Sequence, residues 1–289
     1  MRERFDISER RACRVLEQPR SSQRYAPRKA DKDAAIIERM VTLSSENPRY
    51  GYRRVWALLR REGWEVNKKR VERLWREADL KVPQKQYKKR RPLLGISENG
   101  CTRRRAEHLD HVWSYDFAMD QTDDGRRLKI MPIVDEYSRE CLALEMERSI
   151  TASDVVETLD RLFMERGEPE YIRSDNGPEF IAEALKRHLA TSGVRTLYIE
   201  AGSPWENAYT ETFVSRLRDE LLDRELFANL KEAKVLAEDY RQHYNHHRPH
   251  GALGYLTPAE FADLHQLLLQ DPGAGEEMKK LQCVPRLPS

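Results

Sequence analysis

The hydrophobic periodicity of the chain changes near residue 106, and this change limits the folds that the sequence can adopt. Apolar residues in 33–80 recur at helical spacing, whereas from His111 onward they first alternate with polar residues, as in a strand. Strand-length and helix-length segments then follow one another. The sequence therefore predicts an all-helical unit followed by a unit of mixed α/β structure.

The first unit has the pattern of three helices. Residues 36–43 have helical spacing, residues 55–59 mark a second helix that Gly63 stops, and Asn67 is suited to cap a third. Two short helices joined by a Gly-containing turn, with a basic second helix, are typical of a helix-turn-helix. A basic three-helix bundle that reads no groove is the alternative.

Charge is divided unequally along the chain. Residues 1–105 carry 30 Lys and Arg against 14 Asp and Glu, whereas residues 106–289 carry 21 against 35, so the net charge of +2 hides the division. A basic module for a polyanion is indicated, with a merely solvated basic face as the alternative. Interleaved Trp and Tyr residues favour nucleic acid. The candidate DNA contacts lie in the third helix: Asn67, Lys68, Lys69, Arg70 and Arg73.

The second unit has the pattern of three successive strands followed by alternating helices and strands, which predicts a mixed α/β layout. The expected strands are residues 112–119, 128–134, 141–146, 171–173 and 194–199. A helix capped by Thr151 or Ser153 precedes the fourth strand, and a helix over 178–191 follows it. A later helical pattern ends at Arg248-Pro249.

These patterns predict the domain organisation. The Pro- and Gly-containing basic stretch 81–106 reads as a linker that touches phosphates. We expect five segments. They are a basic N-terminal helix and linker (1–32), a helix-turn-helix domain (33–80), the basic linker (81–106), the mixed α/β core with a C-terminal helix (107–269) and a flexible tail (270–289).

The composition excludes several classes of protein. No apolar run approaches the roughly 18 residues of a membrane span, and the N-terminus lacks the apolar stretch of a signal peptide. The four cysteines are far apart and form no CxxC pair, so a disulfide framework or a zinc ribbon is disfavoured and a cytoplasmic location is expected.

Three acidic residues stand out by their context. Asp116 lies in an aromatic strand, where a charge is costly unless it is paired or binds a metal. Asp175 follows a strand, and strand ends face the ligand crevice of α/β sheets. Glu211 lies on a helix predicted to begin near Ser203, on the same face as Asn207, Ser215 and Arg218. Taken singly, an edge-strand residue, a turn residue and a solvated helix residue are the alternatives.

Asp116, Asp175 and Glu211, with 35 residues between the last two, resemble the DDE triad of retroviral-integrase-like transposases. Arg218, seven residues after the glutamate, fits the same pattern. Four sequence words also match: VDEYSR at 134–139, SDNGPEF at 174–180, GSPWENAYTE at 202–211 and YNHHRPHGALGYLTPAEF at 244–261. With the upstream helix-turn-helix, the chain is similar to the second-frame (OrfB) product of a large bacterial insertion-sequence family, from near residue 30 to about residue 262.

The resemblance implies an RNase H-like mixed sheet core with helices on both faces. It also implies two divalent cations, Mg²⁺ or Mn²⁺ as a substitute, with Asp116 as the bridging ligand and Asp175 and Glu211 on one cation each. We expect Asn176 and Gly177 to shape the turn that aims Asp175. Asn207 is expected to bond the active-site backbone or DNA, and Arg218 to contact a phosphate or to pair with Glu211 or Glu225.

The function implied is that of a bacterial, nucleoid-associated transposase that binds element-end DNA and catalyses strand cleavage and transfer. Its expected partners are the terminal repeats, target DNA, further copies of itself and an upstream-frame helix-turn-helix protein or fusion. The alternatives are a DNA-binding protein with an inactive integrase-like domain and a nuclease on the same core. Histidines crowd residues 243–250 and 108–111, where packing is favoured over a zinc site.

Overall fold

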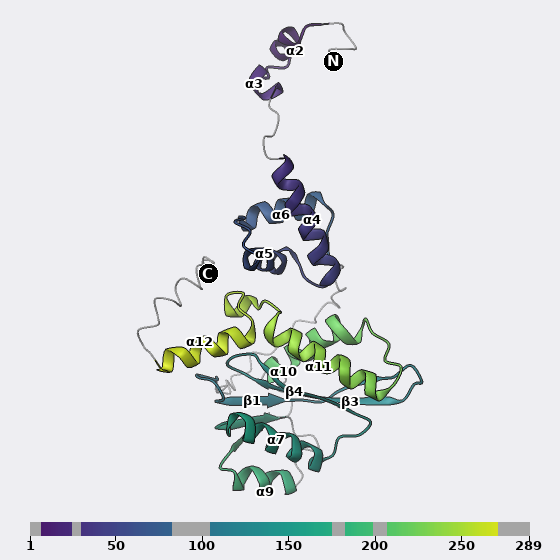
Figure 1. Ribbon diagram of the computed structural model, residues 1–289, viewed down its shortest axis with the longest axis vertical. Helices are drawn as coiled ribbons and strands as arrows, with labels where there is room; N and C mark the ends of the chain where they lie inside the picture. The colour runs from purple at the N-terminus through teal and green to yellow at the C-terminus, as the bar shows by residue number, and fades with distance from the viewer. Residues whose placement is uncertain (1–6, 25–29, 83–104, 175–182, 199–206, 271–289) are drawn as a thin grey trace, which may run out of the picture. The chain divides into compact units, whose positions relative to one another are not determined.

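The computed structural model describes residues 7–24, 30–82, 105–174, 183–198 and 207–270 (Figure 1). The chain divides into two compact units, Met1–Pro83 and Gln84–Ser289. Most of the predicted basic linker and the predicted tail therefore lie outside the described residues. Within the described ranges, no helix is both long enough and apolar enough to cross a membrane.

The first unit is helical, as predicted. Its helices are α2 (Glu9–Val15), α3 (Arg20–Gln23), α4 (Ala30–Glu46), α5 (Tyr52–Arg61) and α6 (Lys68–Glu77). Helix α4 begins inside the stretch that the sequence suggested as a linker. The last three helices bury apolar side chains such as Met40, Leu59 and Val71. The prediction that Asn67 caps α6 is confirmed, because its side chain accepts a hydrogen bond from the Lys69 backbone N–H at 3.0 Å.

The second unit is built on a six-stranded mixed sheet. Strand β3 pairs antiparallel with β1 and β2 along one edge and with β4 along the other, while β1, β5 and β6 pair in parallel. The strands are β1 (Val112–Tyr115), β2 (Ala118–Gln121), β3 (Arg127–Asp135), β4 (Cys141–Glu147), β5 (Tyr171–Ser174) and β6 (Arg195–Tyr198). The parallel pairing places the carboxyl ends of β1 and β5 at the same end of the sheet.

The first predicted strand is wrong in one respect. The alternation over 112–119 predicts one continuous strand, but the structure interrupts it at Asp116 and Phe117 between β1 and β2. The Asp116 carboxylate accepts a hydrogen bond from the Phe117 backbone N–H at 2.7 Å, so the side chain itself bonds to the backbone at the break. Asp116 therefore lies directly after the carboxyl end of β1.

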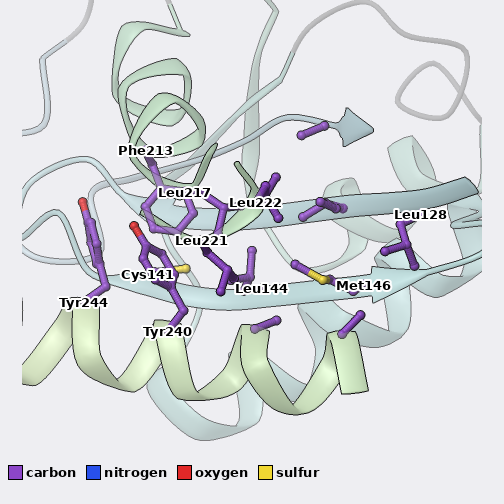
Figure 2. Close-up of a cluster of buried hydrophobic side chains, with 14 of the residues drawn as sticks. Leu128, Cys141, Leu144, Met146, Phe213, Leu217, Leu221, Leu222, Tyr240 and Tyr244 are labelled. Carbon is purple, nitrogen blue, oxygen red and sulfur yellow. The ribbon is translucent and has the colours of Figure 1, made fainter. Parts of the chain in front are cut away.

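Helices cover both faces of the sheet, as the fold prediction requires (Figure 1). They are α7 (Ala152–Arg166), α9 (Glu183–Thr191), α10 (Ala208–Leu217), the π-helical turn η2 (Arg218–Leu222), α11 (Leu230–His246), the 3₁₀ turn η3 (Gly251–Leu253) and α12 (Pro258–Gln270). Helices α7 and α9 pack on the face that carries Trp113 and Tyr115. Helices α10 and α11 pack on the other face, around Leu144 and Phe213 (Figure 2).

The helix-start predictions have mixed outcomes. Thr151, one of two candidates, caps α7 in a capping box with Asp154. The predicted start of the Glu211 helix, near Ser203, lies outside the described residues, and the described helix α10 has Asn207 at its N-cap. The prediction of a helix over 178–191 is met from Glu183 onward, where the description of that segment begins.

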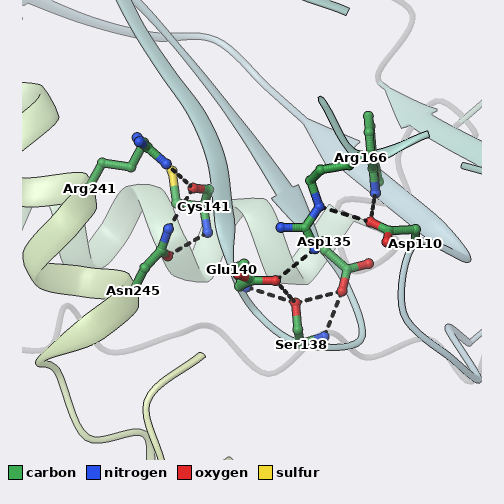
Figure 3. A network of polar contacts seen from close by, with 9 residues as sticks. Asp110, Asp135, Ser138, Glu140, Cys141, Arg166, Arg241 and Asn245 are labelled. Carbon is green, nitrogen blue, oxygen red and sulfur yellow. Dashed lines mark hydrogen bonds and ion pairs between the residues drawn. The ribbon is translucent and has the colours of Figure 1, made fainter. Parts of the chain in front are cut away.

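A buried polar network lies at the end of the sheet where the chain passes from β3 to β4 (Figure 3). Asp135 is fully buried, and one carboxylate oxygen accepts hydrogen bonds from the backbone and hydroxyl of Ser138 at 2.7 and 2.6 Å. Arg166 pairs with Glu140 at 2.9 Å and with Asp110 at 3.4 Å. Burial raises the pKa of Asp135 from 3.8 to about 6 against the opposing Ser138 bonds, and the negative charges of Asp110 and Glu140 add to the rise.

This raised pKa predicts a pH dependence of stability. The folded state holds the Asp135 proton more tightly than the unfolded state, so the stabilisation is complete below pH 3.8 and is lost as the pH rises through about 6. The difference corresponds to about 3 kcal/mol. Asp135→Asn has no charge to bury. We therefore expect its free energy of unfolding, measured with urea, to increase relative to that of the wild type as the pH rises from 4.5 to 7.5. A constant difference between the two proteins across this range would contradict the assignment.

Candidate active site

The start of α10 lies directly on the end of β1. The Thr210 hydroxyl donates a hydrogen bond to the Ser114 hydroxyl at 2.7 Å, and both side chains are completely buried. The Asn207 amide donates to the Tyr115 carbonyl at 3.4 Å. Helix and strand are thus joined at Ser114 and Tyr115, the last two residues of β1, directly before Asp116.

Asp116 and Glu211 each come next in the chain after this contact. Side chains alternate along β1, so Trp113 and Tyr115 face α7 and Ser114 faces α10, and Asp116 follows at the break after this strand. Glu211 follows Thr210 on α10, where it is exposed to solvent. Asp116 is half-buried. The structure thus brings the backbones of two of the three predicted triad positions to the same end of the sheet.

The third predicted carboxylate, Asp175, lies outside the described residues, as do Asn176 and Gly177. The described strand β5 ends at Ser174, the residue before Asp175 in the sequence. Strand β5 pairs in parallel with β1, with Ser114 opposite Arg173. Strands β1 and β5 therefore end side by side, and Asp116 and Asp175 follow them in the sequence.

Asn207 and Arg218, two predicted DNA contacts, make protein contacts in the structure. Asn207 is 4% exposed, and within the described residues its amide oxygen is buried without a hydrogen-bond partner. Arg218 donates to the Met119 carbonyl at 3.0 Å, and the described part of the chain holds no ion pair between it and Glu211 or Glu225. Of the two roles expected for Asn207, the backbone bond is present, and DNA contact by either residue stays a prediction.

A buried lysine beside the strand break was not predicted from the sequence. Lys129 on β3 is 8% exposed, and its ammonium donates to the Ile150 carbonyl at 3.1 Å. The same group lies 3.9 Å from the centre of the Phe117 ring, a cation–π contact. The contact holds the residue next to Asp116 against the sheet. One Lys among many in a basic sequence gives no signal of burial.

At the opposite end of β1 and β5, His108, His111 and Glu170 bring possible metal-ligating atoms within 4.8 Å of one another. His111 is buried, and its Nδ1 accepts a hydrogen bond from the Glu107 backbone N–H at 3.0 Å. The neutral ring therefore carries its proton on Nε2, the nitrogen that faces Glu170 at 3.7 Å. A nitrogen that carries a proton offers no lone pair, so this group does not fit a metal centre.

The predicted recognition helix α6 has two kinds of basic residue. Arg70 and Arg73 both bond to Asp33 of α4, at 2.5 and 3.2 Å, and Arg73 also pairs with Glu77. These two arginines therefore join helices within the unit. Lys69 is exposed at the first turn. The Lys68 ammonium lies 5.9 Å from the centre of the Trp56 ring. Lys69 is thus more exposed than Arg70, and DNA contact by either residue stays a prediction.

Known families match nearly the whole described architecture. Residues 106–204 and 192–258 match the family described as integrase core domain, and residues 30–90 match that described as HTH-like domain. The sheet unit is therefore an integrase-type core, and the helical unit is an HTH-like domain.

Relatives from bacterial insertion elements match across the chain. The uncharacterized 31.7 kDa protein of insertion element IS407 from Burkholderia multivorans is 38% identical over 96% of this chain and 99% of its own length. The transposase InsD of insertion element IS2 from Escherichia coli is 30% identical over 79% of this chain and 78% of its own length. The chain belongs to this family of insertion-element transposases with an integrase core.

Solved integrase structures are more distant. The catalytic core of HTLV-2 integrase in complex with magnesium, in its dimeric form, aligns with 55% of this chain and 99% of its own at 16% identity and a TM-score of 0.43. The intasome of simian T-cell lymphotropic virus aligns with 86% of this chain and 76% of its own at 15% identity and a TM-score of 0.47.

The two kinds of basic residue in α6 predict different mutant behaviour. We expect Lys69→Ala to reduce the slope of log affinity for element-end DNA against log salt by about 0.9, the effect of one phosphate contact on duplex DNA. Its melting temperature should be unchanged, because Lys69 is exposed. Arg70→Ala should lower the melting temperature, because Asp33 loses a bonded partner. A salt slope equal to that of the wild type in Lys69→Ala would remove this residue from the DNA interface.

Proposed function

We propose that this transposase cleaves and joins DNA strands at the carboxyl ends of β1 and β5, with Asp116, Asp175 and Glu211 as its catalytic carboxylates. Its substrates are the DNA ends of its element and a target duplex. The observation that carries the proposal is the contact of α10 with β1 through Thr210 and Ser114. That contact brings an acidic position from each of two distant parts of the sequence to the same end of the sheet.

The residue types at this end of the sheet fit divalent cations. Carboxylate oxygens are the ligands that Mg²⁺ prefers, and Mg²⁺ usually retains several waters, so exposed carboxylates suit it. Asp116 is half-buried after a strand and Glu211 is exposed, which leaves both open to water and substrate. We propose that Asp116, Asp175 and Glu211 hold two such ions, with Mn²⁺ as a substitute.

The chemistry follows from what such a site provides. Bound cations supply Lewis-acid stabilisation to the attacking and leaving oxygens of a phosphodiester. The protein residues contribute position: the Phe117 N–H holds one Asp116 oxygen, and the Thr210–Ser114 bond holds the helix that carries Glu211. The attacking group is a water or a DNA 3′-hydroxyl, so no side chain has to form a covalent bond to DNA.

The HTH-like unit and the core divide the work in this proposal. The basic residues of α6, Lys69 first among them, bind the phosphates of the element end, and the core carries out strand cleavage and transfer. Assembly of several copies on DNA would allow two element ends to be processed together. A DNA-binding protein with an inactive core is the alternative, and it predicts the same DNA affinity without strand transfer.

Removal of single carboxylates tests the proposal. We expect Asp116→Asn, Asp175→Asn and Glu211→Gln each to reduce strand cleavage and transfer by several orders of magnitude while DNA affinity is kept, because each loses a charged oxygen ligand but keeps its shape. The measurement uses labelled element-end DNA, a target plasmid and Mg²⁺. Glu157→Gln, which removes an exposed carboxylate of α7 on the other face of the sheet, is the matched control.

Two results would contradict the proposal. An inactive wild-type protein that still binds element ends would favour the DNA-binding alternative. A Glu211→Gln variant with full activity would show that the acidic residue of α10 has no catalytic part, whatever the role of the two aspartates.

A further inference from the structure

The helix that carries Glu211 does not end as an α-helix. After Leu217 it continues as the π-helical turn η2, in which the Asp223 backbone N–H donates to the Arg218 carbonyl, five residues earlier, at 2.8 Å. A π-helical turn holds more residues than an α-helical turn, so it changes the rotation between the segments on either side. Such turns are rare, appear mostly as single turns within α-helices and are frequent at functional sites.

A buried ion pair holds this turn. Arg248, just beyond the end of α11, donates from Nε and Nη2 to the two carboxylate oxygens of Glu220 at 2.8 and 2.7 Å. The side chains are 2% and 9% exposed. The planar guanidinium fork fixes both the distance and the orientation of the carboxylate, which a single hydrogen bond or a lysine does not do.

Aromatic side chains surround the pair on the α11 side. The Tyr240 hydroxyl donates to Glu220 at 3.4 Å, and Tyr244 lies under the Arg248 guanidinium at 5.4 Å from its ring centre. Tyr244 also contacts Phe213 of α10 edge-on, with ring centres 4.8 Å apart. Tyr244 and Arg248 of the YNHHRPH word, which the catalytic proposal leaves unexplained, therefore connect the end of α11 to α10 and its π-helical turn.

Stability alone does not account for such a pair. Two charges lose their hydration on burial, and well-packed apolar residues of similar size often serve stability equally well or better. A buried fork can instead select one arrangement of the elements it joins. Here it joins the turn after α10 to the end of α11, and α11 is itself attached to the edge strand by Asn245, whose amide bonds to both backbone groups of Cys141 at 2.9 Å.

We propose that the Glu220–Arg248 pair is a positioning device that fixes the rotation of α10 and thereby the direction of Glu211. The inference rests on the proposed function, because it assumes that Glu211 is a catalytic carboxylate. Helix α10 is held near its start by Thr210 on Ser114 and beyond its end by Glu220 on Arg248. The π-helical turn accommodates one more residue between these two attachments than an α-helical turn would.

The consequence of losing the pair follows from helix geometry. Successive residues of an α-helix are rotated by about 100°, so a π-helical turn that relaxes to α changes the rotation between α10 and the residues beyond η2 by a large fraction of that angle. Glu211 is exposed and has no packing of its own to restore its direction. Its alignment therefore depends on how the helix is held, by the Thr210 contact, by the buried Phe213 and Leu217, and by the Glu220–Arg248 pair.

The decisive variant replaces the pair by apolar residues of similar size, Glu220→Leu with Arg248→Met. This double variant is expected to fold, since it buries no unpaired charge. We expect its affinity for Mn²⁺, followed by electron paramagnetic resonance on the full chain, to fall about tenfold or more, as when supporting contacts of a metal ligand are lost. Hydrogen exchange of the backbone over 208–222 should become faster. Arg248→Lys, which keeps the charge without the fork, should show the same changes in weaker form.

Two reference variants separate positioning from folding and from the proposed function. Leu159→Ala destabilises the other face of the sheet and should lower the melting temperature without changing Mn²⁺ affinity or exchange over 208–222. Glu211→Gln reports the loss of the carboxylate itself. Wild-type Mn²⁺ affinity in the double variant beside a defective Glu211→Gln would overturn the positioning role alone. Wild-type Mn²⁺ affinity and strand transfer in Glu211→Gln would overturn the proposed role of Glu211 and this inference with it.

Discussion

The hydrogen bond between Thr210 and Ser114 joins the two parts of the core that carry Asp116 and Glu211, and the arrangement of the site depends on it. The two hydroxyls are completely buried, and the Thr210 hydroxyl would lose its partner on the strand if the helix shifted, whereas Ser114 also bonds to the Val134 carbonyl at 3.5 Å. A buried polar group without a partner is costly, which makes one register of helix and strand favourable over its neighbours. Small residues at the crossing also let α10 come close to β1.

The two ends of the sheet have different chemistry for a structural reason. Strands β1 and β5 are parallel, so their carboxyl ends lie at the same end of the sheet. The residues that follow these two strands are therefore available for a site. The opposite end contains Glu140 and Arg166, which pair with each other, and Asp135, which is buried and bonds to Ser138 through one oxygen only. Acidic residues there bond to serine or arginine, whereas Asp116 and Glu211 remain accessible to solvent.

The sequence predicts the elements of both units well, because apolar periodicity is strong in α4 to α6 and in the strands. It fails at the interruption of the first strand, since the alternation continues unchanged through Asp116 and Phe117. The π-helical turn was also missed, because Phe213, Leu217 and Leu221 keep the spacing of an α-helix. The site residues carry a signal only as sequence words. The contacts of Thr210 and Glu220 could not be predicted, because the sequence does not show whether a hydroxyl or a charged group on a helix is exposed or buried.

Two buried ion pairs of the core lie where the orientation of a strand or helix near the proposed site has to be fixed. Arg173 pairs with Glu136 at 2.8 Å one residue before the end of β5, and Arg248 pairs with Glu220 one turn after α10. One member of each pair, Arg173 or Glu220, therefore lies within a few residues of a proposed catalytic carboxylate or of the helix that carries one. Apolar contacts fill volume but tolerate small rotations, whereas a guanidinium and a carboxylate bond well in few orientations. A site built from carboxylates on separate elements requires that directional control, because its ligand atoms must converge on common points.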